Sequence, residues 1–194
     1  MSKTREAWLE SGVIELAARL FKRVGYEVPE KIKVSCSWPH KNGTAARQTR
    51  VGECWSPVAS AAGNHEIMIS HLIDDSLEVL SVLTHEVVHA VVGVEAGHKA
   101  AFRRCALAVG LTGKMTATTA GDELQAELKR IIETLGEYPH ARLNPELSGR
   151  KKQTTRLVKV QCPDCGYAAR VTRRWLDEVG APICPCNNTP MNEA

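Results

Sequence analysis

The stretch His-Glu-Val-Val-His-Ala-Val-Val-Gly-Val-Glu-Ala-Gly-His-Lys-Ala-Ala-Phe, residues 85–102, joins a helical pattern to three histidines. Leucines and valines at helical spacing precede it and give a broad apolar surface, which predicts a buried helix over 74–92. Gly93 and Gly97 interrupt the pattern, and a second helix is predicted over 99–109. We therefore expect this helix pair at the centre of the domain.

The flanking sequence predicts a small sheet and two further helices. Alternating or β-rich stretches at 31–38, 48–55 and 65–70 predict short strands. A helix is predicted over 4–24, and Asp122 with Gln125 resembles a capping box that opens another helix ending at Gly136. Three short strands are too few for a closed barrel, so the predicted fold class is α+β, a small three-stranded sheet covered by helices.

Length and composition fit a soluble protein with one ordinary domain and a small appendage. The chain has 194 residues, of which 43% are hydrophobic and 24% charged. No apolar run approaches the roughly 20 residues that cross a bilayer, and the first residues lack the apolar core of a signal peptide. We therefore expect a cytoplasmic monomer with no membrane partner.

His85, Glu86 and His89 have the spacing of a hydrolytic zinc site. Residues four apart share one helix face, so both imidazoles can bind one metal ion, while Glu86 is rotated by about 100° and can reach a metal-bound water. Zinc activates the water and a glutamate takes its proton. Such a site needs a third protein ligand and an open fourth position.

Two residues compete for the third ligand position, Glu95 and His98. The metzincin pattern fails, because it would need glycine where Val92 stands and histidine where Glu95 stands. A turn at Gly97 can bring His98 back beside the end of the first helix, and Phe102, one turn later, can anchor it in the core. His98 is favoured, and Glu95 remains the alternative.

The His-Glu-x-x-His motif, followed by Gly97-His98 and by Phe102 four positions after that histidine, resembles the SprT-like metallopeptidase family, which includes the Spartan proteases of DNA–protein crosslink repair. The resemblance covers about residues 5–135. It implies a zincin-like fold, zinc bound by His85, His89 and His98, and Glu86 as the catalytic base. Lys99 departs from the family, where glycine is frequent, and this affects the expected shape of the cleft.

Four of the seven cysteines predict a second metal site. Cys162-Pro-Asp-Cys165 and Cys184-Pro-Cys186 have the separation of a zinc ribbon, in which four thiolates hold a structural zinc ion. A domain this small depends on the metal for its folding free energy. The Cys-x-Cys spacing of the second pair departs from the usual Cys-x-x-Cys, so a non-ligand Cys186 is the alternative.

The basic excess belongs to the tail, since residues 150–194 carry 8 basic and 4 acidic side chains. Basic groups on a small module, with exposed aromatic residues among them, are suited to nucleic acid. The alternative is a basic surface that serves only solubility. The aromatic candidates are Tyr167 and Trp175, and the basic candidates are Lys151, Lys152, Arg156, Arg170, Arg173 and Arg174.

The remaining histidines, cysteines and late polar residues are assigned no chemistry. Tyr138, His140 and Arg142 follow the last predicted helix and could fold over the cleft, but the surface reading is favoured. A further group has no partner at ligand spacing and is expected to be structural, solvated or packed as small apolar residues: His40, His65, His71, Cys36, Cys54 and Cys105.

These observations predict a metallopeptidase domain over 1–138, a basic linker over 139–156 and a zinc ribbon over 157–194. The predicted cofactors are two zinc ions per chain, one catalytic and one structural. The predicted substrate is a protein or peptide, with DNA as a possible partner of the ribbon. The competing hypothesis is a nucleic-acid-binding or regulatory protein that uses the first domain as a non-catalytic scaffold.

Overall fold

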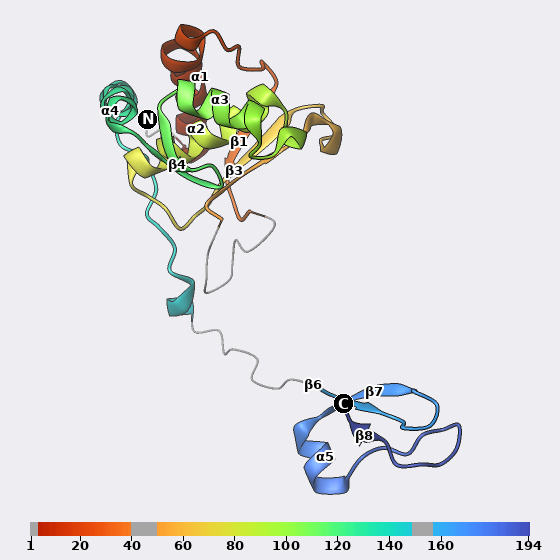
Figure 1. Cartoon of the computed structure of the whole chain (residues 1–194). Coiled ribbons are helices and arrows are strands. Elements are labelled where there is room, and N and C mark those ends of the chain that lie inside the picture. The colour runs from red at the N-terminus through yellow and green to blue at the C-terminus, as the bar shows by residue number, and fades with distance from the viewer. Residues whose placement is uncertain (1–3, 40–49, 149–156) are drawn as a thin grey trace. The chain divides into compact units, whose positions relative to one another are not determined.

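The computed structural model describes residues 4–39, 50–148 and 157–194. The chain divides into two compact units, Met1–Ser148 and Gly149–Ala194 (Figure 1). The first unit mixes helices with small sheets, as the sequence predicts. None of the helices within the described ranges has both the length and the apolar character needed to cross a membrane.

The sheet of the first unit has three strands, β1 (Ile32–Cys36), β2 (Gly52–Trp55) and β3 (His65–Ile69). Their order is β1-β3-β2, with β1 parallel and β2 antiparallel to β3. The three predicted strands are confirmed. The second is shorter than predicted, since Arg50 and Val51 lie outside it and residues 48–49 are not described.

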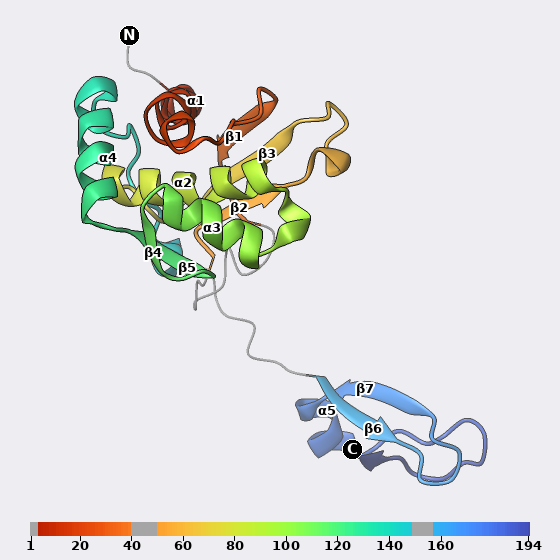
Figure 2. The same cartoon turned by 45° about the horizontal axis from the view of Figure 1, so that its top comes forward.

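One face of this sheet is buried by helices. Val34, Ile67 and Cys54 lie side by side across the strands, and all three are buried. Helices α1 (Arg5–Leu16) and α2 (Ser76–Val92) pack on the sheet (Figure 2). The predicted first helix is confirmed, although its second half becomes a π-helical turn, η1 (Ala17–Phe21), and a 3-10 turn, η2 (Lys22–Val24).

Helices α3 (Ala100–Ala108) and α4 (Asp122–Leu135) pack against α2 and complete the core. The predicted capping box at Asp122 is wrong. Gly121 is the N-cap residue and no side chain caps the helix. Asp122 is itself helical, and the side-chain Nε2 of Gln125 donates to the Ala120 carbonyl at 2.9 Å.

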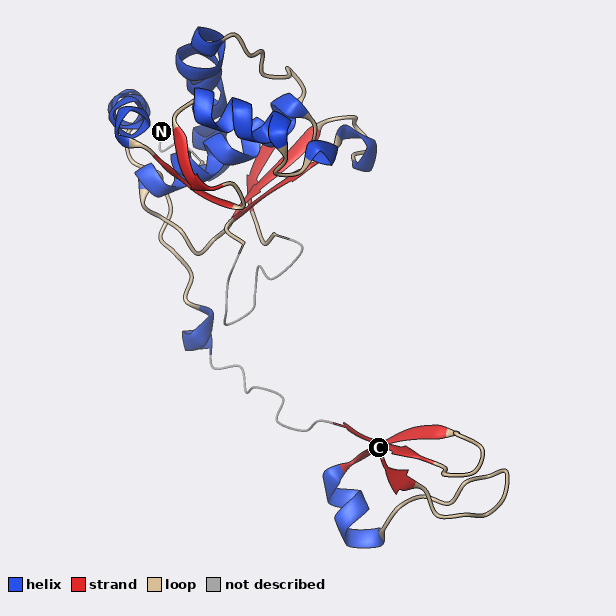
Figure 3. Ribbon diagram, in the orientation of Figure 1, coloured by secondary structure: helices blue, strands red, loops and turns tan. Residues whose placement is uncertain are grey.

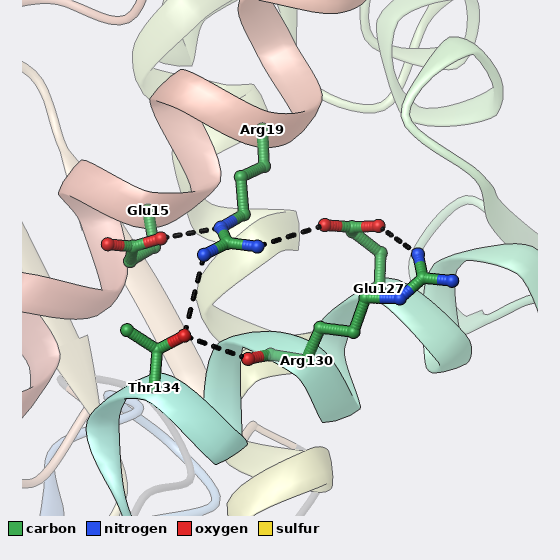
Figure 4. A network of polar contacts seen from close by, with 5 residues as sticks. All are labelled: Glu15, Arg19, Glu127, Arg130 and Thr134. Carbon is green, nitrogen blue, oxygen red and sulfur yellow. Dashed lines mark hydrogen bonds and ion pairs between the residues drawn. The ribbon is translucent and has the colours of Figure 1, made fainter.

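A polar network ties the first helical segment to α4 (Figure 4). Arg19 is 2.6 Å from the Glu15 carboxylate, 3.7 Å from Glu127 and 3.4 Å from the Thr134 hydroxyl. Arg130 binds the other oxygen of Glu127 at 2.7 Å. Glu15, Arg19 and Glu127 are partly buried and Arg130 is exposed, so the network positions the two helices and adds a modest stabilisation.

Two features of the first unit have no counterpart among the predicted elements. Strands β4 (Leu111–Lys114) and β5 (Ala117–Ala120) form a hairpin between α3 and α4 (Figure 3). Short 3-10 turns, η3 (Pro57–Ala59), η4 (Val94–Ala96) and η5 (Pro145–Ser148), lie in the connections. The hairpin matters most, because it forms one wall of the site described below.

The second unit is a small sheet with one helix. Strands β6 (Leu157–Gln161), β7 (Ala168–Thr172) and β8 (Asn192–Glu193) have the order β7-β6-β8, and α5 (Arg173–Val179) follows β7. Its buried residues are few: Val160, Cys162, Cys184 and Met191. So small a core cannot hold a fold by apolar burial alone, and an additional cross-link is expected.

Candidate functional site

Helix α2 carries the histidine motif on its second half. The helix begins where the Asp75 side chain accepts a hydrogen bond from the Glu78 amide at 2.8 Å. Most of its surface is buried, including Glu86 and His89, which expose 6% and 8% of their area. Polar side chains so deep in a core need specific partners.

The segment after α2 folds back so that His98 meets the other two histidines. Gly93 and Gly97 both have a positive φ angle, 87° and 51°, which residues with a side chain rarely adopt. The 3-10 turn η4 lies between them. The Nε2 atom of His98 lies 3.2 Å from Nε2 of His85 and 3.2 Å from Nε2 of His89. Glu95 is not part of this group.

Phe102 supports all three rings. It is fully buried, and its ring centroid lies 4.8 Å from that of His85, 4.4 Å from His89 and 4.9 Å from His98. The position one helical turn after His98 was expected to anchor that histidine. In the structure it is a common platform for the whole cluster.

The histidines are held in their neutral form. Burial first, and then the neighbouring histidines, lower the pKa of His85 to about 3, and burial lowers that of His89 to about 4. The pKa of His98 is also lowered, by burial and by Arg50. Neutral imidazoles offer an unshared electron pair, which is the form that binds metals.

A hydroxyl group that the sequence analysis missed orients His85. Its Nδ1 atom lies 2.8 Å from Oγ1 of Thr118 on β5. When Nδ1–H donates to this hydroxyl oxygen, Nε2 of His85 stays unprotonated and faces the other histidines. Metal-binding histidines are typically oriented by such a second hydrogen bond.

The cluster fits a metal ion. When none of the three Nε2 atoms carries a proton, they cannot form hydrogen bonds among themselves, and a cation is their natural partner. Their 3.2 Å separations match the ~3.3 Å expected between two nitrogens bound tetrahedrally to zinc at about 2.0–2.1 Å. His85, His89 and His98 are thus a candidate metal centre.

Glu86 lies beside the cluster in a space that a glycine provides. A β-carbon at Gly52 of β2 would lie 2.5 Å from Oε1 of Glu86 and 2.6 Å from Cγ1 of Val82. Burial raises the pKa of Glu86 to about 8, with a smaller opposing effect of Arg50. A cation held by the three histidines would lower this pKa and favour the carboxylate form. The sequence signal for this approach was a glycine at the start of a strand.

A cleft of about 1210 Å³ opens over the histidines and Glu86. One side is β2 with its flanking residues, from Arg50 to Ser56, and another is the hairpin from Thr116 to Ala120. Among the described strands, β2 is an edge strand, because the order of the sheet is β1-β3-β2. The outer side of β2 can therefore accept an extended chain by backbone hydrogen bonds.

In the second unit two turns of similar geometry present the cysteines. The carbonyl of Cys162 accepts from the Gly166 amide at 3.1 Å, and that of Cys184 from the Asn188 amide at 2.9 Å. Gly166 and Asn188 both have positive φ, 76° and 55°. The pKa of Cys162 is lowered to about 7, chiefly by a hydrogen bond from the backbone amide of Cys165, and this favours the thiolate.

Three of the four predicted sulfur atoms come together. Those of Cys162, Cys165 and Cys184 lie within 4.8 Å of one another and can hold a metal ion. Cys186 is outside this group. It is nevertheless close to Cys165, since a hydrogen bond with Cys165 is the main cause that raises the pKa of Cys186 to about 12. Asn187 lies three residues after Cys184, as Cys165 lies three residues after Cys162, so Asn187 and not Cys186 takes the equivalent position in the second turn. Its Nδ2 lies 3.7 Å from the Cys162 sulfur.

The predicted nucleic-acid-binding residues differ in their surroundings. Arg170 is exposed on β7, directly opposite Lys159 of β6. Arg173 binds the Glu193 carboxylate through both of its terminal nitrogens, and Arg174 binds Glu178 at 2.9 Å. Their charges are thus partly compensated. Tyr167 and Trp175 are about half exposed, and Lys151, Lys152 and Arg156 lie outside the described residues.

The residues that could have covered the cleft lie elsewhere. Tyr138 is buried against Trp8, with ring centroids 5.0 Å apart, and His140 contacts the His71 carbonyl at 3.0 Å. Neither these two nor Arg142 lines the cleft. Cys36, Cys54 and Cys105 are buried in the core as predicted, His65 is half-buried, and His40 is outside the described residues. His71, for which spacing showed no partner, meets Cys36 and His140 in space.

Comparisons with protein-family models, with curated proteins and with solved structures gave no match. The geometry of the two candidate metal centres is therefore the basis for a functional proposal.

Proposed function

We propose that the protein is a zinc-dependent metallopeptidase with a SprT-like, zincin-like catalytic domain. The observation that carries the proposal is the convergence of three neutral histidine nitrogens beside a buried glutamate, in an open cleft. A purely structural zinc ion takes four protein ligands and needs no base. Three ligands with Glu86 adjacent to them are the arrangement of a hydrolase.

A zinc ion held by His85, His89 and His98 would lower the pKa of a bound water toward neutrality and polarise the scissile carbonyl. Glu86 then takes a proton from the attacking water on a carboxylate oxygen and returns it to the leaving amine. Thr118 fixes the orientation of His85, and the space at Gly52 lets Glu86 reach the water. Each chain residue thus has one defined task.

A protein segment in extended conformation is the proposed substrate. It would lie antiparallel or parallel to β2, whose outer edge has no neighbouring strand among the described residues. Main-chain hydrogen bonds to an edge strand bind many sequences, and the cleft walls then select side chains. The hairpin residues from Thr116 to Ala120 form the opposite wall.

The second unit is proposed to bind a structural zinc ion and to deliver the peptidase to DNA-associated proteins. The grouped sulfurs of Cys162, Cys165 and Cys184 support the zinc ion. The adjacent cations of Lys159 and Arg170 support phosphate contacts, which basic side chains make without sequence preference. Tyr167, about half exposed, is the proposed base-stacking residue.

The test is cleavage of a DNA-bound protein, and of the enzyme itself, with and without single-stranded DNA. Wild type, Glu86→Gln and the control Glu95→Gln are compared, each with its zinc content measured. The proposal expects DNA-stimulated cleavage by wild type and Glu95→Gln, none by Glu86→Gln, and equal zinc in all three. Equal inertness of all three proteins with zinc bound would favour the scaffold hypothesis.

A further inference from the structure

A cluster of metal-binding side chains lies outside the cleft, at the end of the sheet of the first unit. Strands β1 and β3 are parallel, so their C-terminal ends lie at the same end of the sheet. Cys36 is the last residue of β1, and His71 lies two residues after the end of β3. The chain after α4 returns to this edge and adds His140. The ligand atoms of these three residues lie within 4.8 Å of one another.

The geometry of the cluster suits a tetrahedral ion. The Cys36 sulfur lies 3.2 Å from Nδ1 of His71. A sulfur and a nitrogen bound to one zinc ion, at about 2.3 and 2.0–2.1 Å, are roughly 3.5 Å apart. One thiolate and two imidazoles form a donor set that zinc and similar transition metals prefer over calcium or magnesium.

Backbone contacts fix His140 in the form that can bind a metal. Its Nε2–H donates to the carbonyl oxygen of His71 at 3.0 Å, so Nδ1 keeps its electron pair. The same carbonyl accepts the Leu143 amide at 2.9 Å, and the Arg142 amide donates to Asp74 at 3.1 Å. A carbonyl partner that sets the tautomer is typical of a metal-binding histidine.

A cation already occupies the focus of the three ligands. Nη1 of Arg5 lies 3.4 Å from Nδ1 of His71, 3.4 Å from Nδ1 of His140 and 3.9 Å from the Cys36 sulfur. Because Arg5 can only donate, its contact with Nδ1 of His71 is suited to an Nδ1 that keeps its electron pair. Arg5 is the first residue of α1, and its long side chain has several alternative rotamers.

A buried hydroxyl faces the same place. Tyr138 is 4% exposed, and its OH forms no hydrogen bond of ordinary geometry among the described residues. Burial and then the neighbouring Cys36 sulfur raise its pKa. An unpaired buried hydroxyl costs stability, which a further polar partner at this point would recover.

We propose that Cys36, His71 and His140 form an additional transition-metal site, which a zinc-class ion enters by displacing the Arg5 guanidinium. On binding, the Cys36 thiol releases its proton to solvent as the metal–sulfur bond forms. The three ligands come from β1, from the loop after β3 and from the segment after α4. The ion therefore cross-links three distant parts of the first unit.

The first experiment counts zinc ions per chain in the full-length protein by inductively coupled plasma mass spectrometry. Cys36→Ala is compared with Cys105→Ala, which also loses a buried thiol but has no metal-binding group around it among the described residues. The proposal expects one ion fewer in Cys36→Ala than in Cys105→Ala. The half-buried His140 gives a second variant, His140→Ala, which is expected to lose the same ion even if Cys36→Ala does not fold.

The second experiment uses Co²⁺ as a spectroscopic probe. In a full chain that carries Cys162→Ser and Cys165→Ser, a thiolate-to-cobalt absorption band is expected, and it disappears when Cys36→Ala is added. Arg5→Met is expected to strengthen Co²⁺ binding, because the competing cation is gone. Equal zinc content in Cys36→Ala, His140→Ala and Cys105→Ala, or no thiolate band in the double serine variant, would overturn the proposal. Glu86→Gln leaves both results unchanged, so they are independent of the proposed peptidase activity.

Discussion

Gly52→Ala tests whether the position of Glu86 controls catalysis. The new β-carbon would lie 2.5 Å from Oε1 and 2.9 Å from Cγ of Glu86, whereas ordinary contacts begin near 3.4 Å. The carboxylate must therefore move by about 0.9 Å, the difference between 3.4 and 2.5 Å. Gly52 has no positive φ, so the backbone itself accepts alanine.

A displacement of this size has a calculable effect on the rate. A shift of about 1 Å in a catalytic group lowers the rate by roughly 100-fold. That factor corresponds to about 2.7 kcal/mol in the activation free energy. Crowding against Glu86 and Val82 adds an expected loss of about 1–3 kcal/mol in the free energy of unfolding. His85, His89 and His98 are not touched, so the zinc content stays at the wild-type level.

The assay is single-turnover cleavage of a DNA-bound protein, with zinc content and thermal stability measured on the same samples. Gly12→Ala is the matched control, because its β-carbon would meet only Leu83 and Leu80, at 3.2 and 3.3 Å, away from the cleft. It is expected to change stability but not the cleavage rate. A Gly52→Ala protein that keeps its zinc and cleaves within about threefold of wild type would refute the reasoning.

Three further predictions concern the two candidate metal centres and the basic residues of the second unit. Thr118→Val removes the hydrogen bond to His85, so zinc affinity should fall by about tenfold in a chelator competition, with the fold unchanged by circular dichroism. Cys184→Ser should unfold the second unit and expose it to limited proteolysis, because its apolar core is too small without a metal. Lys159→Gln with Arg170→Gln should weaken single-stranded DNA binding and flatten its salt dependence, whereas Arg174→Gln, whose charge is paired with Glu178, should do so less.

Local patterns predicted helix α2 and the common face of its two histidines, because residues of one helix that lie one turn apart point in the same direction. His85 and His89 are one turn apart, and their common direction follows from helical geometry alone. The position of His98 beside the other two histidines could also be predicted from the sequence, since Gly93 and Gly97 mark a turn that only glycine readily forms. The predicted helices and strands of the first unit are confirmed, although residues 17–24 form π and 3-10 turns, residues 48–49 of the second predicted strand are not described, and the β4–β5 hairpin was not predicted.

Contacts between segments far apart in the sequence could not be predicted from local patterns. Thr118 reaches His85 from a hairpin whose turn, Met115-Thr116, lacks the glycine or asparagine that usually signals one. Gly52 approaches Glu86 only because β2 lies beside α2 in the folded chain. The failed capping box at Asp122 has a local cause, because two competing start positions differ by one residue and the backbone selected Gly121.

The same limit explains why Cys36, His71 and His140 were assigned no chemistry. Ligand spacing finds sites within one turn or knuckle. Cys36 and His71 meet through the parallel pairing of β1 with β3, and His140 joins them from the segment after α4. Their position also predicts what a metal there would do. The segment after α4 is pinned to the start of α2, where the Ser76 hydroxyl accepts the Tyr138 amide at 2.9 Å.

Of the proposed catalytic ligands, His85 and His89 lie on the second half of α2 and His98 follows η4, and all three are held by other groups, chiefly Phe102 and Thr118. Loss of the Cys36 site should therefore lower the melting temperature of the first unit and leave its cleavage rate nearly unchanged. A Cys36→Ala protein with wild-type stability in excess zinc, but with impaired cleavage, would contradict this separation of the two sites.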